Sequence, residues 1–455
     1  MKDTYASPAA VRSWIMFDWA AQPFFTLVTT FVYAPYFASA VAGDPAQGQS
    51  LWGFATAAAG IMIALFSPVL GAIADAGGRR KPWILAFGLL LVIGSSLLWF
   101  GKPGEPHTVA IVLFAFALAS IGAEFATVFN NAMMPSLVPP ERIGRLSGTG
   151  WAVGYVGGLV SLVLTLGFLA GNPQTGKTLL GFEPLFNLSS VAREGDRASG
   201  PLTALWFVIF VLPMFVFTPD HAKGLPLSQA IGQGLSELKA TLRTLPTQRN
   251  AASFLLANLI YTDGLVALFA FGGIYAAGIF GWTTIHIGLF GILLTITGAL
   301  GAWLGGKLDD RLGPKKVIMG ALTILIVAAL ILLSIDRDHV FFAIAVAPPI
   351  EGALYGGTAE KIYLLVGAMI GAVVGPAQAA SRTLLIQVAP ENRVTQYFGL
   401  FALSGKVTSF MGPLRVGIVT GVTASQKSGM AVLVAFFATG LLLLLRVNDG
   451  NAASR

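Results

Sequence analysis

Long apolar runs recur from one end of the chain to the other, and they restrict its possible folds more than any other feature. Of 455 residues, 55% are hydrophobic and only 11% are charged. A soluble core of this size could not bury so much apolar surface. Many of the runs reach the roughly 20 residues with which a helix crosses about 30 Å of hydrocarbon. The sequence therefore predicts an all-α integral membrane protein.

The apolar runs divide into twelve predicted transmembrane helices. Their approximate limits are 14–41, 51–74, 83–101, 108–133, 147–170, 201–218, 252–278, 285–306, 315–335, 361–388, 397–421 and 428–446. The first run is too long for the core of a cleaved signal and contains Asp18 and Pro35, so we expect no segment to be removed.

The placement of positive charge predicts how these spans are oriented. If the N-terminus is cytoplasmic, Lys and Arg gather in the inner connections, whereas the short outer connections 43–50 and 279–284 contain neither. Such a bias places both termini in the cytoplasm. It also explains the net charge of +7 by topology, so we expect membrane lipids and no nucleic acid as partners.

Several kinds of chemistry are not expected. The chain has no cysteine, and its four histidines are scattered without the spacing of metal ligands, which argues against a metal or redox site. The run GTGWAVG at 148–154 lies inside a span, and no phosphate loop GxxxxGK[ST] occurs. We therefore expect no cofactor and no enzyme activity.

A polar, basic stretch at 219–250 separates two halves of six spans each, 1–218 and 251–455. Within this linker, the segment LSQAIGQGLSELKATLRTL predicts an amphipathic helix on the inner membrane surface. Residues 336–360 form a long outer connection that we expect to lie partly at the membrane interface.

The two halves repeat each other at two places. The loop after the second span, GAIADAGGRRK from Gly71, matches the loop after the eighth span, GKLDDRLGPKK from Gly306. The run SLVPPERIGRLSG at 136–148 similarly matches IQVAPENRVTQYFG at 386–399. These echoes predict two pseudo-symmetric six-helix bundles that arose by duplication.

The duplicated loop pattern G-x-x-x-D-x-x-G-x-[RK]-[RK] resembles the loop signature of the major facilitator superfamily. Four longer segments resemble its vacuole effluxer-like branch: FDWAAQPFFTLVTTFVYAPYF, NAMMPSLVPPERIGRLSGTGWAVGYVGG, IYTDGLVALFAFGGIYAAG and QAASRTLLIQVAPENRVTQYFGLFALSGKVTSFMGP. The resemblance implies the major facilitator fold, a monomer, and export of small solutes across a bacterial inner membrane. Eukaryotic members of that branch are credited with moving amino acids out of the vacuole.

The resemblance also implies a conformational latch in the duplicated loops. Asp75 would hold the halves in one conformation, with Asp310 as its duplicate, although Ala76 stands where the family usually has a cation. The candidate cations of the latch and inner gate are Arg79, Arg80, Arg142, Arg145 and Arg311. Asp18 lies only six residues after Arg12, so we expect it first at the inner gate, paired with Arg142 or Arg145, and second at a proton site.

Ionisable residues inside spans are disfavoured by about 2.5 to 3.5 kcal/mol at a helix centre, so they usually face a cavity or a partner. Glu124 shares one helical face with Ser120, Thr127 and Asn131. This stripe is either a cavity-facing proton or amine site or an interhelical hydrogen bond. Asp263 is expected near the bilayer middle, and the same two readings apply to it.

Three cations are also expected within spans. Arg382 lies one turn from Gln378, where it could bind a substrate carboxylate, pair with an intramembrane acid or extend to the inner surface. The same three interpretations apply to Lys406. We expect Arg415 to extend outward or to pair with Glu351 or Glu360.

Glycines four residues apart, Gly150, Gly154 and Gly158 in the fifth span and Gly301 and Gly305 in the eighth, predict close helix packing that also permits sliding. The leading hypothesis is a proton-coupled secondary transporter that exports amino acids or similar zwitterions by alternating access. A carboxylate in low-dielectric surroundings takes up protons more readily, which suits proton coupling. An exporter of drugs or lipid-like compounds is the alternative, kept open by thirty-two phenylalanines, and a membrane sensor or enzyme is a second alternative.

Overall fold

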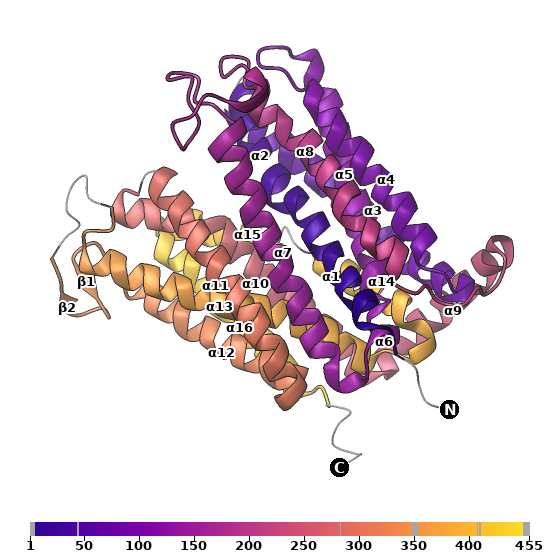
Figure 1. The fold of residues 1–455 in the computed structure, drawn as a ribbon. Coiled ribbons are helices and arrows are strands. Elements are labelled where there is room, and N and C mark those ends of the chain that lie inside the picture. The colour runs from indigo at the N-terminus through magenta and orange to yellow at the C-terminus, as the bar shows by residue number, and fades with distance from the viewer. Residues whose placement is uncertain are drawn as a thin grey trace. The chain divides into compact units, whose positions relative to one another are not determined.

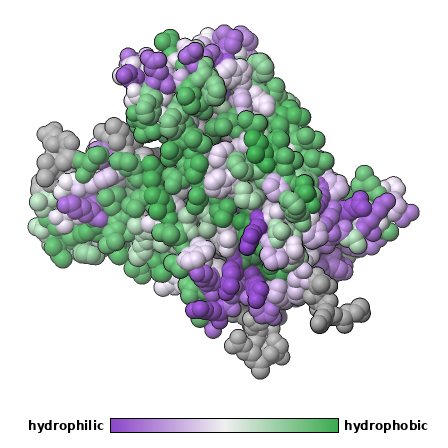
Figure 2. Space-filling view, viewed as in Figure 1, coloured by the Kyte–Doolittle hydropathy of each residue, from purple (hydrophilic) through white to green (hydrophobic). Residues whose placement is uncertain are grey.

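A computed structural model of the protein describes residues 5–42, 45–282, 284–347, 354–406, 408 and 411–448. The described chain is helical except for loops and one short antiparallel pair, β1 (His339–Val340) and β2 (Ile344–Ala345). Eleven of its helices are long and apolar enough to cross a membrane. Apolar side chains cover much of the visible surface (Figure 2). Large apolar side chains are exposed along these helices, for example Leu300 at 59% and Leu365 at 71%. Such a surface suits lipid and not water.

The chain divides into two compact units. The first comprises Met1–Pro139 and Val153–Leu238, and the second comprises Pro140–Ala152 and Lys239–Arg455. The helix α7 (Ile143–Leu164) therefore contributes its first residues to the second unit and the remainder to the first. The two compact units do not correspond to a simple division of the sequence, because residues 140–152 belong to the second unit. The boundaries predicted at 218 and 251 therefore remain a prediction.

The remaining helices of the first unit are α1 (Pro8–Pro23), α2 (Tyr33–Tyr36), α3 (Pro45–Gly77), α4 (Lys81–Leu97), α5 (His107–Asn131), α6 (Met134–Leu137) and α8 (Glu194–Phe217). α4 packs on both α5 and α8, and Figure 1 shows α4 alongside α5. Glycine permits the closest approach: a Cβ atom at Gly122 would lie 2.6 Å from the main-chain oxygen of Phe87. The first unit is thus assembled through small residues, as membrane helices commonly are.

The first predicted span is not one regular helix. Ser7 caps α1 by accepting the main-chain N–H of Ala10 at 3.2 Å, and the helix ends at Pro23. It continues as two π-helical segments, Phe24–Phe31 and Phe37–Val41, on either side of α2. π-helical turns interrupt the regular hydrogen-bond ladder and occur often at functional sites. The sequence showed the length of this span but not its interruptions.

The helices of the second unit are α10 (Arg249–Phe280), α11 (Thr284–Leu312), α12 (Pro314–Leu333), α13 (Thr358–Val388), α14 (Val394–Lys406), α15 (Met411–Thr423) and α16 (Gln426–Leu445). α12 begins where its sequence predicts, with Pro314 in the first turn after Gly313 at φ 88°. α11 and α13 cross closely, because Gly305 faces Pro376 and a Cβ atom there would lie 2.5 Å from the proline Cβ. Gly301 packs on Ala372 in the same interface, so the predicted glycine spacing has a packing role here.

Two further predicted elements, one in the second half and one in the linker, take specific forms. The span expected at 397–421 comprises α14 and α15, and positions 407, 409 and 410 between them lie outside the described residues. The predicted amphipathic segment forms a single helix, α9 (Leu227–Thr244). Its residues Ala230, Leu238 and Thr241 are buried, whereas Leu227 and Leu235 are exposed. The helix is confirmed, and the membrane contact expected for it stays a prediction.

Candidate functional site

The first copy of the duplicated loop, between α3 and α4, is closed by an ion pair within the loop. Nη2 of Arg80 lies 2.6 Å from Oδ1 of Asp75, and these side chains are only 7% and 3% exposed. Arg80 also donates through Nη1 to the main-chain oxygens of Ala74, at 2.8 Å, and Gly78. Burial lowers the pKa of Arg80, and the carboxylates of Asp75 and Asp220 oppose that effect. The neighbouring Arg79 is exposed. Asp75, the predicted latch, is thus bonded inside its own loop in this conformation.

The connection after α8 packs against that loop. Oδ1 of Asp220 accepts the main-chain N–H of Arg80 at 2.8 Å, and the N–H of Gly224 donates to Gly77 at 2.9 Å. A glycine is required at Gly78, whose φ is 80° and whose Cβ position would lie 2.7 Å from the nitrogen of Gly224. His221 is half-buried here, and its pKa falls to about 4 through burial and the positive charge of Arg80. The first loop is therefore held in place by an ion pair and by hydrogen bonds to the connection after α8.

The second copy of the loop, at the end of α11, binds the start of α7 within the second unit. Oδ1 of Asp310 accepts the main-chain N–H of Arg145 at 2.9 Å, and Oδ2 lies 3.3 Å from Nε of the same residue. Arg142 adds its positive charge at Asp310, while Arg311 is exposed. A carboxylate at the first turn of a helix satisfies a main-chain donor and favours the helix dipole. The structure thus brings together Asp310, Arg142 and Arg145, and it leaves Arg311 outside this contact.

The first turns of α7 lie very close to α11. A Cβ atom at Gly148 would lie 2.5 Å from the main-chain oxygen of Ala302 and 2.6 Å from the Cα atom of Gly306. A Cβ atom at Gly144 would similarly lie 2.6 Å from Cγ of Asp309, a buried carboxyl that is 3% exposed. The predicted glycine face of the fifth span therefore extends further toward its start than Gly150. Neither Gly144 nor Asp309 was singled out from the sequence.

Arg382 of α13 holds the same part of α7 from the other side. Its Nε donates to Oγ of Ser147 at 3.0 Å and its Nη2 to the main-chain oxygen of Ser147 at 2.7 Å. Ser147 Oγ in turn donates to the main-chain oxygen of Ala379 at 2.8 Å. The guanidinium also lies 5.4 Å from the centroid of the Trp151 ring. In this conformation the predicted carboxylate-binding group is bonded to a neighbouring helix.

Asp263 of α10 is the most buried of the predicted intramembrane acids, at 2% exposure. Thr408 donates to its Oδ1 at 3.2 Å, and a Cβ atom at Gly412 of α15 would lie 2.9 Å from the Asp263 carbonyl carbon. Five residues earlier on α10, Asn258 donates to Oγ of Ser404 at 2.9 Å. α10, α14 and α15 thus build a small polar region inside an apolar unit.

Arg415 of α15 is exposed, and its expected extension outward or pairing with Glu351 stays a prediction. Its positive charge acts on Asp263, and its guanidinium lies 5.3 Å from the centroid of the Phe436 ring. Glu360, one expected partner, instead accepts Trp282 Nε1 at 2.8 Å and the N–H of Gly357 at 2.9 Å. Glu351, the other, lies outside the described residues. The residues beside Arg415 in the sequence are apolar, so they did not predict that its charge would act on an acid of α10.

The other predicted site residues lie on their expected helices. Glu124 and Gln378 are half-buried on α5 and α13, and Asn131 is 7% exposed at the end of α5. Asp18 is half-buried on α1, with its Cβ 3.4 Å from the position of a Cβ atom at Gly154. Its predicted pairing with Arg142 or Arg145 stays a prediction, and in this structure Arg145 contacts Asp310. α14 ends at Lys406, whose side chain lies outside the described part.

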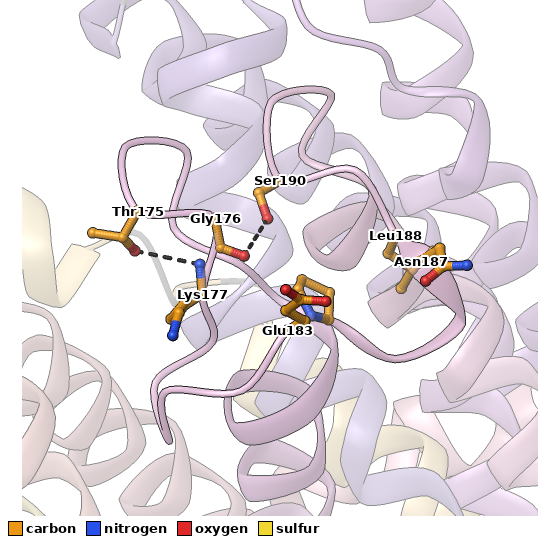
Figure 3. A pocket seen from close by; sticks show the side chains of 8 residues that line it. Thr175, Gly176, Lys177, Glu183, Asn187, Leu188 and Ser190 are labelled. Atoms are coloured by element: carbon orange, nitrogen blue, oxygen red, sulfur yellow. Dashed lines mark hydrogen bonds between the residues drawn. The ribbon is translucent and has the colours of Figure 1, made fainter.

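A separate hollow of about 250 Å³ lies in the connection between α7 and α8 (Figure 3). Lys177 and Glu183 line it, together with Thr175 and Ser190, whose hydroxyl donates to the oxygen of Gly176 at 3.2 Å. Both charged side chains are exposed. The hollow contains none of the predicted site residues, so it adds nothing to the transport site.

Comparison with known proteins agrees with this architecture. A family sequence profile described as "Vacuole effluxer Atg22 like" matches residues 41–454. The "Uncharacterized MFS-type transporter YxiO" of Bacillus subtilis (strain 168) is 23% identical over 442 residues, covering 96% of this chain and 94% of its own. "Autophagy-related protein 22" of Cryptococcus neoformans is 25% identical over 319 residues, covering 67% of this chain but only 50% of its own.

Solved structures show the same fold. The major facilitator transporter FucP in the outward conformation superposes with a TM-score of 0.69 at 16% identity, covering 97% of this chain and 99% of that one. The proton:xylose symporter XylE superposes with a TM-score of 0.68 at 13% identity, covering 96% of this chain and 94% of that one. The all-helical, multi-pass major facilitator fold is thereby confirmed. The chain belongs to the vacuole effluxer Atg22-like family of the major facilitator superfamily, which comprises secondary transporters and not enzymes.

Proposed function

We propose that this protein exports amino acids or similar small zwitterions by alternating access, driven by protons. The observation that carries the proposal is the buried carboxyl of Asp263, which meets a hydroxyl from Thr408 and the positive charge of Arg415. A buried negative group and a positive charge that acts on it suit a solute that bears both charges. The family description, a vacuole effluxer, supports the direction of transport.

Each predicted site residue has a role in this proposal. Asp263 and Glu124 take up the proton or bind the substrate amine. Arg382 binds the substrate carboxylate once α7 has moved away from it, because Nε and Nη2 of Arg382 both donate to Ser147 in the present conformation. The supporting polar groups are Asn131, Gln378 and Lys406. Proton uptake at a carboxyl that is alternately buried and hydrated would couple the proton to the conformational change.

The duplicated loops are the proposed latch. Asp310 binds the first turn of α7 through Arg145, so movement of α7 requires this contact to break. Asp75, Arg79 and Arg80 form the equivalent loop of the first unit, and Asp18 is the proposed inner-gate acid. Arg142 and Arg311 supply further positive charge. In the cell we place the protein in the bacterial inner membrane as a monomer, with both termini in the cytoplasm.

A thermal-shift screen of the purified protein tests the substrate class. A ligand that binds the folded state raises the melting temperature by mass action, by an amount that grows with concentration. We expect shifts with amino acids, and none with sugars or with amino-acid analogues that lack either charge. Shifts confined to amphipathic drugs or lipids would favour the alternative exporter. A positive ligand is then tested for pH-gradient-driven uptake into proteoliposomes.

A further inference from the structure

The surface of the second unit contains an apolar groove that the transport site does not use. It has a volume of about 440 Å³ and lies between α11, α12 and α13. On the α11 side it is bordered by Leu300, Leu304 and Leu308, which are 59%, 51% and 47% exposed. Because these helices are candidate membrane spans, the groove opens toward the hydrocarbon. Figure 1 shows the three helices running along one another in this unit.

Glycines give the groove its depth. Gly301 and Gly305 of α11 lie at its floor, where α13 crosses at Ala372 and Pro376. Gly320 of α12 forms part of its wall, and a Cβ atom there would have no neighbour within 4 Å. A side chain at 320 would therefore extend into open space. The lining of the groove is almost purely apolar, which suits a flexible hydrocarbon chain.

One end of the groove is positively charged. Lys316, in the first turn of α12, is the only charged residue among those that line it. Its side chain is exposed, and among the described residues it has no hydrogen bond or ion pair. By contrast, the adjacent Lys315 donates to the main-chain oxygen of Val447 at 2.6 Å. A lysine at a helix end can lay its apolar stem along the groove and extend its ammonium to the membrane interface.

We propose that this groove binds one acyl chain of an anionic phospholipid, whose phosphate contacts the ammonium of Lys316. The apolar walls bury the chain, and the charge selects the headgroup, so the two features together define a lipid and not a second protein. The loop that carries Lys316 also carries Asp310, the residue that binds the start of α7. A lipid bound here therefore lies beside the proposed latch, on the same loop.

Native mass spectrometry of the full chain, released from detergent micelles, tests the proposal. The probes are phosphatidylglycerol and phosphatidylcholine with identical acyl chains. We expect the wild-type protein to retain phosphatidylglycerol several-fold better than phosphatidylcholine. Lys316→Gln is expected to bring the two lipids to the same low level. Gly320→Leu, which fills the groove, is expected to reduce retention of both.

Two matched variants serve as controls. Gly288 of α11 also has no neighbour within 4 Å of its Cβ position but does not line the groove, so Gly288→Leu should retain lipid as the wild type does. Lys223, exposed in the connection after α8, does not line it either, so Lys223→Gln should keep the preference for phosphatidylglycerol. If Gly320→Leu does not fold, Ile324→Trp fills the groove one turn further along.

Three results would overturn the proposal. One is unchanged lipid retention in both groove-filling variants, which would show that the bound lipid lies elsewhere. Another is equal retention of the two lipids by the wild type. The last is an unchanged preference of Lys316→Gln for phosphatidylglycerol, which would show that Lys316 does not contact the headgroup.

Discussion

Arg382 of α13 donates two hydrogen bonds to one residue of α7, Ser147, through Nε to its hydroxyl and through Nη2 to its main-chain oxygen. The guanidinium is buried, at 4% exposure for the residue. A cation in a membrane span is thereby satisfied by polar groups of a helix whose first turns belong to the same compact unit. This contact fixes the start of α7 against α13.

Removal of the Arg382 side chain should destabilise the second unit. Hydrogen bonds to a charged group contribute about 1.5 to 3 kcal/mol, and Arg382→Met leaves the Ser147 oxygen without its donor. We expect the free energy of unfolding in mixed micelles to fall by about 2 kcal/mol, and by less in Arg382→Lys. Lys361→Gln, an exposed position on the same helix, is the control. Equal stability of Arg382→Met and the control would contradict the role of this contact.

Loss of the Asp310 side chain should destabilise the protein more than loss of the side chain of its ion-pair partner, Arg145. Arg145 is 59% exposed, and exposed ion pairs contribute at most about 1 kcal/mol and weaken with salt. The hydrogen bond from the Arg145 main chain remains when the side chain changes. We therefore expect Asp310→Ala to cost about 1 kcal/mol at low and high salt, as loss of a helix cap does, and Arg145→Gln to have a smaller, salt-dependent effect.

The measurement for Asp310 is thermal unfolding at two ionic strengths, together with maleimide labelling of a cysteine introduced at Arg142. The natural chain has no cysteine, so the label reports this position alone. Labelling should rise in Asp310→Ala and stay constant in Lys361→Gln, an exposed position on α13 outside the proposed latch. Equal labelling in the two variants would argue against the latch.

The glycines of α7 should differ in their tolerance of alanine. At Gly148 a Cβ atom would lie 2.5 Å from the Ala302 oxygen, so Gly148→Ala forces α7 away from α11 at a cost of about 1 to 3 kcal/mol. At Gly154 the nearest atom would lie 3.4 Å away, an ordinary contact, and alanine favours the helix. Melting temperatures should therefore fall for Gly148→Ala and hold or rise for Gly154→Ala. The reverse order would contradict this packing.

His221 should make stability depend on pH. Its folded-state pKa of about 4 lies below the usual value near 6.5, so between these values the unfolded chain binds more protons. Stability should be full above pH 6.5 and fall as the pH decreases toward 4, by at most about 1.4 kcal/mol per pH unit. The measurement is the melting temperature as a function of pH in the wild type and in His221→Gln. The slope should be shallower in the variant. Identical slopes would show that other groups carry the effect.

Asp263→Asn tests the proposed proton coupling. An amide cannot take up and release a proton at this position, so we expect pH-gradient-driven uptake into proteoliposomes to fall at least tenfold while substrate exchange persists. Asp338→Asn, whose carboxylate is 63% exposed, is the matched control and should transport normally. Gradient-driven uptake at the wild-type rate in Asp263→Asn would remove Asp263 from the coupling mechanism.

Arg415→Gln tests whether the positive charge that acts on Asp263 helps Arg382 to bind the substrate carboxylate. We expect a raised KM for an amino acid with little change for its decarboxylated analogue. A structural role alone would change both substrates alike, or lower the amount of folded protein.

The sequence by itself determined the class of fold, because the length of an apolar run and the sign of the charges beside it act locally. The limits of α12 followed, within two residues, from the apolar run at 315–335, and those of α9 from a polar–apolar period. The duplicated loops with Asp75 and Asp310 followed from direct repetition. Each of these patterns lies within a short continuous segment of the sequence.

Only the tertiary structure decided the partners. The α7 residues Gly144, Ser147 and Gly148 meet α11 and α13, more than 150 residues later in the chain, and no local pattern encodes such a distance. Arg382 binds Ser147, and Arg415 acts on Asp263, because an intramembrane charge takes whichever polar group the helix packing brings near it. Burial costs fix that such a charge must have a partner, while the packing of distant helices selects which one.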